Sequence, residues 1–403
     1  MSGVAGYRIA MFQPGVRASM GIVGHQDLGA ALCALGHEFQ LLSTAVEPTS
    51  EVVPWKVLPE PPWTRGLVAE LGAPFLRTRR LLATAVALAR HLRLSGKSID
   101  VLYTLIAYPQ ATAAALAIAW SGWQGRFVVM PAGEDVLVAK EASFGFRRFP
   151  LPRYLVGRTL RQAHGICCIS PAIREIVTRY HPKGIVADVQ DNVAAAVVRL
   201  AEASPRERSE RREQARRRVD KELGTAGAPI ALALGRLHPV KGLDRLIDLL
   251  PGLPHRLLVV GPSLTMRGRG DIATALRALA VERGVADRVV LTGRVPAERS
   301  YDLLAAADVL AIPSHCESIP KTAVEAAALG TPFVVTDTCG VAAVPRGETL
   351  GRVVRHWDPA AFADALSAAT GLCPEPEEGR AFVHRFSPER VARDIDRLLE
   401  KMG

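Results

Sequence analysis

The chain has 403 residues and a formal net charge of +10, and 49% of its residues are hydrophobic, 22% charged and 5% aromatic. This length favours two or three domains over one core, and the composition is that of an ordinary soluble globular protein. The six cysteines show neither a metal-binding spacing nor a disulfide framework. The longest apolar run, Leu105–Trp120, is shorter than the ~20 residues of a membrane span, and the first residues do not resemble a signal peptide. We therefore expect a cytoplasmic protein.

Positive charge is concentrated in one segment, Arg206–Lys221, which carries eight basic and four acidic side chains. A footprint for nucleic acid or acidic lipid would explain this charge. A solvated helix with i,i+4 ion pairs explains it better, because acidic residues are interleaved and no aromatic residue accompanies the arginines to stack on bases. We expect no nucleic-acid partner. The remaining charge could still attract an anionic donor or a membrane-embedded acceptor, so a peripheral contact with the inner face of the membrane stays open.

The first half of the chain alternates short apolar strands with helices, which is the pattern of a parallel sheet. The expected strands are 7–12, 38–42, 100–104, 126–130, 165–169 and 184–189, and the expected helices are 21–35, 81–94, 105–120, 153–164 and one that starts at 170. The segment 47–74 is rich in Pro and Trp and predicts a loop. Gly21 and Gly24 follow the first strand, where glycine either lets the backbone approach a phosphate or only packs a helix on a sheet.

The alternation starts again after a hinge at Gly224–Pro229. Strands are expected at 230–234, 256–260 and 288–291, and helices at 241–250, 271–283, 297–306 and 388–402. Two such series with no sequence repeat predict two Rossmann-like lobes. We expect an acceptor-binding domain at 1–190, a basic linker helix at 191–228, a nucleotide-sugar domain at 229–385, and a helix at 386–403 that returns to the first domain.

The segment 308–335 gives the sharpest functional signal. It reads as an apolar strand, a polar turn, a helix and a second strand, with Glu317 in the turn and Glu325 on the helix. Ligands bind at the carboxyl ends of the strands in such sheets, where the helix also presents its amino-terminal N–H groups to anions. Two acids that can bind hydroxyls, beside a helix end that can bind phosphate, suit a sugar nucleotide.

The segment 235–242, with the sequence GRLHPVKG, opens the second lobe. Arg236 follows the strand end at Gly235, and Lys241 begins the next helix. Cations at these positions can clamp a diphosphate and neutralise a departing nucleotide. Two surface cations in a loop are a plain alternative. The Glu pair at the same edge of the same sheet favours the clamp.

Three segments together resemble the retaining glycosyltransferases of family 4, which have the GT-B fold of two Rossmann-like domains facing across a cleft. Gly235-Arg236-Leu237 with Lys241-Gly242 is similar to the family's diphosphate motif. Pro313-Ser314-x-x-Glu317-Ser318 through Glu325-Ala326 is similar to its Glu-x7-Glu motif. Gly293-Arg294-Val295 is similar to the loop that lies against the base. The layout is similar over nearly the whole chain.

The resemblance implies a role for each matching residue. Arg236 and Lys241 would hold the donor diphosphate, Glu317 the sugar hydroxyls and Glu325 the ribose. The remaining donor-binding positions that the resemblance implies are Gly21, Gly235, Arg294, Val295 and the backbone of Ser318, Ile319, Lys321 and Thr322. It also implies front-face attack with retention, no enzyme nucleophile, and a departing diphosphate that helps to take the acceptor proton. We expect no metal and no cofactor besides the donor.

This chain departs from the family at several positions. Pro320 has no amide, so one backbone donor found in many relatives is missing. The usual double glycine before the first helix is replaced by Arg17–Gly21, and the usual active-site histidine by Ala132. The imidazole is therefore absent unless His25 or His315 replaces it, although a structural role is expected for both. Glu134 and Asp135 are candidates for acceptor binding or proton transfer, and Asp135 is an equally good candidate for a cap or turn.

Two other enzyme classes fit the sequence poorly. A dehydrogenase fingerprint could be Gly268-x-Gly270-x-x-Ala273, but a seven-residue loop separates it from the preceding strand, where that fingerprint needs a tight turn. The metal-binding Asp-x-Asp motif of the other major glycosyltransferase fold occurs only as Asp394-Ile395-Asp396 in the last helix. Side chains at i and i+2 of a helix point apart, so we expect an exposed helix face there and no metal site.

Two further alternatives keep the GT-B fold: a nucleotide-sugar 2-epimerase and a silent binding subunit. The two motifs together favour hexosyl transfer from a UDP or GDP sugar to a small-molecule, saccharide or lipid-linked hydroxyl. Transfer to an added acceptor would distinguish this function from both alternatives. The base, sugar, acceptor and oligomeric state are not predicted.

Overall fold

A computed structural model describes residues 6–13, 22–44, 54–59, 73–225, 227–266, 268, 270–345 and 348–403. The chain divides into two compact units. Unit 1 comprises residues 1–138, 144–194 and 387–403, and unit 2 comprises residues 139–143 and 195–386. Gly21 and Arg17–Met20 lie outside the described residues, so the predicted approach of Gly21 to phosphate stays a prediction.

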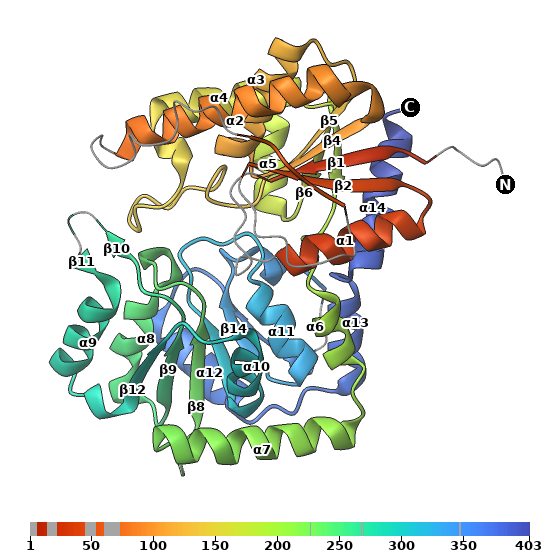
Figure 1. Cartoon of the computed structure of the whole chain (residues 1–403). Helices are drawn as coiled ribbons and strands as arrows, with labels where there is room; N and C mark the ends of the chain where they lie inside the picture. Colours follow the sequence, from red (N-terminus) through yellow and green to blue (C-terminus); the bar gives the residue numbers. More distant parts are fainter. Residues whose placement is uncertain are drawn as a thin grey trace. The chain divides into compact units, whose positions relative to one another are not determined.

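Unit 1 is built on a seven-stranded parallel sheet with the order β3-β2-β1-β4-β5-β6-β7 (Figure 1). Its strands are β1 (Arg8–Phe12), β2 (Glu38–Ser43), β3 (Trp55–Val57), β4 (Val101–Leu105), β5 (Arg126–Met130), β6 (Gly165–Cys168) and β7 (Ile185–Asp188). Strands β4 and β6 are buried along their whole length. Such continuous apolar runs are typical of parallel strands covered on both faces. The short strand β3 lies within the segment 47–74, where a loop was predicted.

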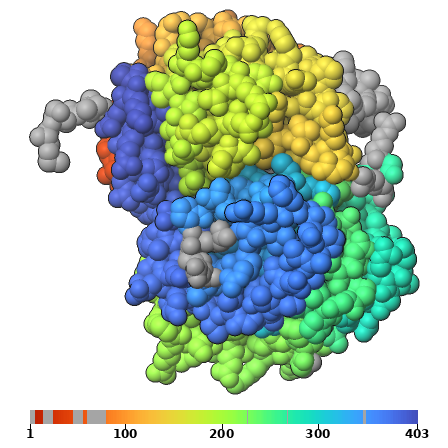
Figure 2. All heavy atoms as spheres, turned by 180° about the vertical axis from the view of Figure 1, so that it is seen from behind, coloured from red at the N-terminus to blue at the C-terminus, as the bar shows by residue number. Residues whose placement is uncertain are grey.

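Six α-helices flank this sheet in the described part of unit 1. They are α1 (Ile22–Ala34), α2 (Ala73–Ser95), α3 (Thr112–Ser121), α4 (Pro150–Gln162), α5 (Pro171–Tyr180) and α14 (Pro388–Lys401). Helices α2 and α3 pack on each other, and α1 packs on α14. In Figure 2, α14 forms the dark blue surface beside the yellow-green part of unit 1. A Cβ on Gly165 of β6 would lie 3.4 Å from Leu398 of α14 and 2.7 Å from Met402 Sδ just after it, so the end of this helix lies close to the strand.

Unit 2 has a six-stranded parallel sheet with the order β12-β9-β8-β13-β14-β15. Its strands are β8 (Ile230–Leu234), β9 (Arg256–Val260), β12 (Val289–Gly293), β13 (Val309–Ile312), β14 (Phe333–Thr336) and β15 (Gly351–Val354). Its helices are α6 (Ala195–Ala201), α7 (Pro205–Leu223), α8 (Leu243–Leu249), α9 (Ile272–Glu282), α10 (Ala297–Ala306), α11 (Lys321–Leu329), α12 (Pro359–Thr370) and α13 (Pro376–His384). The prediction of an α/β fold with two parallel-sheet domains is confirmed.

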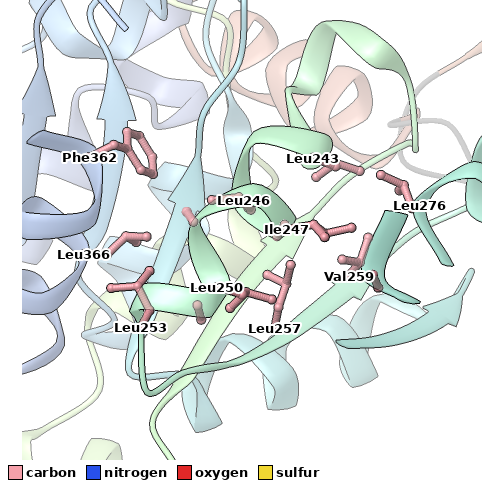
Figure 3. Close-up of a cluster of buried hydrophobic side chains, with 14 of the residues drawn as sticks. Leu243, Leu246, Ile247, Leu250, Leu253, Leu257, Val259, Leu276, Phe362 and Leu366 are labelled. Atoms are coloured by element: carbon pink, nitrogen blue, oxygen red, sulfur yellow. The ribbon is translucent and has the colours of Figure 1, made fainter. Parts of the chain in front are cut away.

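The core of unit 2 lies between its sheet and helices α8, α9 and α12 (Figure 3). Buried side chains recur at Leu243, Leu246 and Ile247 of α8 and at Leu250 directly after it, which is the spacing of one helix face. They pack against Leu257 and Val259 of β9, Leu276 of α9, and Phe362 and Leu366 of α12. This packing fixes the carboxyl end of β8 and the loop that follows it.

The basic segment 206–221 forms α7 and packs on α10 within unit 2. Most of its arginines form ion pairs, four of them with acids four residues away on the same helix. Asp308, at the start of β13, accepts hydrogen bonds from Arg212 at 2.9 Å, Arg216 at 2.7 Å and the backbone N–H of Ile230 at 2.7 Å. The solvated helix with i,i+4 pairs is confirmed, and its inner face is tied to the sheet.

We expect Asp308→Ala to lower the free energy of unfolding by about 2 kcal/mol, because it removes charge-assisted hydrogen bonds from a carboxylate that is only 16% exposed. Urea unfolding followed by circular dichroism measures the change. The matched control is Glu213→Ala, which breaks the exposed pair with Arg217 and should cost less than about 0.5 kcal/mol. Equal losses in the two variants would show that Asp308 does not anchor α7.

No helix in the described part of the chain is both long and apolar enough to cross a membrane. The expected crossover helix at 105–120 is a short π-helical turn, η3 (Ala107–Ala111), followed by α3.

Candidate active site

The candidate site lies at the carboxyl edge of the unit 2 sheet, where the loops after β8 and β13 are adjacent. The short helix η5 (Pro239–Lys241) follows β8 and ends at Lys241. The N–H of His315 donates to the carbonyl of Val240 at 2.8 Å, which joins the loop after β13 to η5. A Cβ on Gly242 would lie 2.3 Å from the carbonyl oxygen of Pro313, so only glycine permits this approach. The backbone therefore brings the two predicted motifs together.

Lys241 and Glu317 form a direct ion pair in a small pocket of unit 2. Lys241 Nζ donates to Glu317 Oε1, and the two side chains are 25% and 16% exposed. The hydroxyl of Ser314 donates to the other oxygen, Oε2, at 3.1 Å. Gly235, Arg236 and Thr322 line the same pocket. An ammonium and a carboxylate held at a sheet edge can bind a phosphate and a sugar hydroxyl side by side.

Loops after two strands hold Glu317 in place. Its N–H donates to the carbonyl of Thr338 at 3.2 Å, and its own carbonyl accepts from the N–H of Gly340 at 2.9 Å. The hydroxyls of Thr336 and Thr338 both donate to the carbonyl of Ser314 at 2.7 Å. These contacts fix the turn after β13 against the turn after β14, so the carboxylate of Glu317 is preorganised.

Gly235 gives the loop after β8 its shape. Its φ is +146°, which disfavours any residue with a side chain, and a Cβ there would lie 3.7 Å from Lys241 Cε. Arg236, which follows it, is exposed. The backbone conformation therefore favours glycine at 235, whereas a Cβ there would make only an ordinary contact with Lys241.

Helix α11 points its amino end at this site. It begins at Lys321, after Pro320, and no side chain of the described residues caps it. Ser318 and Ile319, just before it, are buried. An uncapped helix start carries partial positive charge and favours an anion.

The other predicted donor residues lie further along the same unit. Burial raises the pKa of Glu325, and the charge of Lys321 opposes this shift. Burial and the charges of Glu325 and Glu298 raise the pKa of Tyr301 on α10 to about 12. Arg294 and Val295 follow β12, which is separated from β8 by β9. Two strand spacings of ~4.8 Å therefore separate the strand before Arg294 from the strand before Gly235.

His315 is held by a structural contact. Its Nδ1 lies 2.9 Å from a guanidinium nitrogen of Arg245 and 3.4 Å from Glu141. Burial and the charge of Arg245 lower its pKa. Arg245 in turn stacks on Trp357, with Cζ 4.4 Å from the ring centroid, and donates to the carbonyl of Pro313 at 3.1 Å. His315 therefore supports the loop after β13.

Asp135 is buried in unit 1, where its carboxylate accepts hydrogen bonds from three backbone amides. The amides belong to Ala107 at 2.5 Å, Gly133 at 2.7 Å and Ala132 at 3.2 Å. Burial raises the pKa of Asp135, and the backbone amides oppose this shift. The neighbouring Glu134 is exposed, and His25 is buried on α1. Asp135 thus joins the loops after β4 and β5, which are adjacent strands.

The structure also bears on the two rejected motifs. Between β9 and α9 the chain forms a small hairpin of β10 (Thr265–Met266) and β11 (Gly270–Asp271), not the tight turn of a dinucleotide fingerprint. An exposed helix face was predicted at Asp394 and Asp396, but both side chains have partners. Asp394 pairs with Arg390 and Arg397, whereas Asp396 lies 3.1 Å from the buried His37. No cluster of three or more His, Cys, Asp or Glu side chains that could hold a metal occurs among the described residues.

Ser263 lies at the same edge of the unit 2 sheet and was not among the residues predicted from the sequence. It follows β9, which lies between β8 and β12 in the sheet. Its hydroxyl donates to the carboxylate of Asp271 at 2.5 Å. The Gly-Pro-Ser sequence at 261–263, directly after an apolar strand, was the available signal.

Known proteins are similar to this chain both in sequence and in fold. Residues 228–371 match the family model of glycosyl transferases group 1. The D-inositol 3-phosphate glycosyltransferase of Nocardia farcinica is 40% identical over 159 residues, which are 37% of this chain and 35% of that protein. That of Corynebacterium urealyticum is 33% identical over 223 residues, 52% of this chain and 50% of that protein. The chain thus spans between a third and a half of the length of these curated relatives.

Solved structures match over almost the whole chain. Sucrose-phosphate synthase from Thermosynechococcus elongatus is 20% identical with a TM-score of 0.74, covering 98% of this chain and 99% of that one. Anabaena HepE in complex with UDP and glucose is 16% identical with a TM-score of 0.72, covering 98% and 99%. At such low identity these likenesses show the fold only. Residues 228–371 are thus a glycosyl transferase domain of group 1, carried by a chain whose fold is GT-B.

Proposed function

We propose that this protein is a retaining glycosyltransferase that moves a hexose from a UDP or GDP sugar to a hydroxyl of a small-molecule, saccharide or lipid-linked acceptor. The observation that carries the proposal is the pair of Lys241 and Glu317 beside the amino end of α11. The relatives add support, since those from Nocardia farcinica and Corynebacterium urealyticum are D-inositol 3-phosphate glycosyltransferases, and HepE was solved in complex with UDP and glucose.

In the proposed mechanism, Arg236, Lys241 and the start of α11 hold the diphosphate and neutralise the charge that develops as it departs. Glu317 then leaves its pair with Lys241 to accept hydrogen bonds from the sugar, and Glu325 binds the ribose. The acceptor attacks from the face that the diphosphate leaves, and the diphosphate oxygen takes the acceptor proton. The C–O bond to the acceptor forms as the bond to the diphosphate breaks, with no covalent enzyme intermediate.

We further propose that transfer needs no metal ion, because Lys241, Arg236 and the helix end supply the positive charge that a metal would otherwise bring. We also propose that the protein acts in the cytoplasm and contacts the inner face of the membrane when the acceptor is lipid-linked.

A thermal-shift screen with UDP, GDP and ADP sugars tests the donor part of the proposal. A donor present at 100 times its dissociation constant should stabilise the protein by ~2.7 kcal/mol, which raises the melting temperature by a few degrees. The same shift is expected in excess chelator. A shift that disappears on chelation would contradict metal independence, and no shift with any sugar nucleotide would contradict the donor class.

The donor that shifts the melting temperature is then incubated with the protein, with and without candidate acceptors, and the products are followed by NMR. We expect sugar transfer only with an acceptor, and the donor's anomeric configuration in the product. A sugar altered at C2 without any acceptor would instead indicate an epimerase.

A further inference from the structure

A group of arginines in unit 1, outside α7, has no acidic partner among the residues that the structure describes. Between Glu141 and Glu175 the sequence has six arginines and no aspartate or glutamate. Five of them fall in the segment 147–161, on the short helix η4 (Phe146–Arg148) and on α4. In the described part of the chain none of these five forms an ion pair with an acid, whereas most arginines of α7 do. Charge of this kind remains available to an external anion.

Four of these arginines line one pocket. Arg147, Arg148, Arg153 and Arg161 surround it together with Tyr154 and Tyr180. Helix α4 begins beside it at Pro150, and no described side chain caps this helix start. Guanidinium groups and an uncapped helix start both favour phosphate oxygens.

Arg147 is held in place from within the unit. Its guanidinium donates to the carbonyl of Val136 at 2.7 Å and to the hydroxyl of Tyr180 at 3.2 Å, and Cζ lies 5.4 Å from the centre of the Tyr180 ring. Its Nε is buried with no hydrogen-bond partner among the described residues. Burial raises the pKa of Tyr180, but Arg147 and Arg153 outweigh burial and the pKa is lowered overall. The pocket is therefore preorganised and electropositive.

Exposed apolar side chains border the same pocket. Phe149 is 47% exposed, Leu151 is 57% exposed and Tyr154 is 58% exposed. Arg148 lies over the Phe149 ring, with Cζ 4.7 Å from its centre. The yellow surface of Figure 2 includes this part of unit 1. Exposed aromatic and aliphatic residues among arginines are typical of a surface that enters the headgroup region of a bilayer.

We propose that residues 147–161 dock this protein on membranes that contain acidic phospholipids. The lipid phosphate lies among Arg147, Arg148, Arg153 and Arg161, and Phe149, Leu151 and Tyr154 enter the interface. A soluble phosphate would account for the arginines but not for three exposed apolar side chains within six residues. This docking surface rests on the membrane contact proposed above, but vesicle binding can be measured whether or not the protein transfers a sugar.

Vesicle co-sedimentation of the full chain, without donor or acceptor, tests the proposal. Vesicles of phosphatidylcholine are compared with vesicles that also contain phosphatidylglycerol. We expect binding to the acidic vesicles only, weaker at high salt. The variant R148A/R153A should bind about 30-fold more weakly, since each arginine near an acidic surface contributes about fivefold. Leu151→Ala keeps the charge but removes three carbons, and each buried methylene contributes about fourfold, so we expect binding to weaken by about 60-fold when the side chain is fully inserted.

The matched control is R206A/R217A, which removes two arginines from the exposed face of α7 and changes the net charge equally. It should bind the acidic vesicles almost as the unchanged protein does. Equal weakening by the two double variants would show nonspecific attraction and overturn the proposal. Unchanged binding of Leu151→Ala, with full competition by inorganic phosphate, would identify a site for soluble anions and also overturn it. Melting temperatures of all variants confirm that they are folded.

Discussion

Lys241→Ala should lower kcat/KM for sugar transfer by about 100- to 1,000-fold while the melting temperature changes little. The ammonium group is expected to stabilise the charge on the departing diphosphate, and removing one such preorganised group from an active site typically costs this much. Because the side chain is 25% exposed and its partner Glu317 is also held by Ser314, its loss should leave the fold intact. Initial rates with the donor found in the screen measure the effect.

A double-mutant cycle with Glu317→Ala distinguishes catalysis from a mere structural pair. The two side chains contact each other in the structure, so their single effects should not add. Arg277→Ala, which removes an exposed cation from α9, is the control and should leave the rate unchanged. Full activity in both Lys241→Ala and Glu317→Ala would refute the assignment of the site.

Asp135→Ala should lower the free energy of unfolding by about 3–5 kcal/mol, because it takes the acceptor from three backbone amides, two of them buried and one half-buried. Urea unfolding measures the change. Glu134→Ala makes the same chemical change at the adjacent, exposed position and should cost less than about 0.5 kcal/mol. This prediction separates the two roles considered for Asp135. A variant that keeps its stability but loses sugar transfer would favour proton transfer or acceptor binding over loop fixation.

The sequence predicted the parts of the fold and of the site that depend on local patterns. Continuous apolar runs such as Leu257–Val260 in β9 predicted parallel strands, because burial on both faces leaves few polar residues. Lys241 and Glu317 could be assigned to one site in advance because the strands before them end at the same edge of one sheet, but their ion pair was not predicted.

The parts that the sequence did not predict depend on contacts between distant residues. Asp135 is bonded to Ala107, which is 28 residues away, so no periodicity could indicate it. Arg212 and Arg216 were recognised as surface charges, but their partner Asp308 lies more than 90 residues further along the chain. The free arginines of α4 were overlooked because α7 is more basic in sequence, and only the ion pairs show which of the two helices is neutralised.

The central claim is that the donor diphosphate binds between Gly235, Arg236, Lys241 and the amino end of α11. A crystal structure of the protein with the nucleoside diphosphate selected by the screen tests it most directly. We predict phosphate oxygens within hydrogen-bond distance of Lys241 Nζ, and a Glu317 carboxylate released from Lys241. A diphosphate bound elsewhere, with the pair of Lys241 and Glu317 intact, would contradict the account.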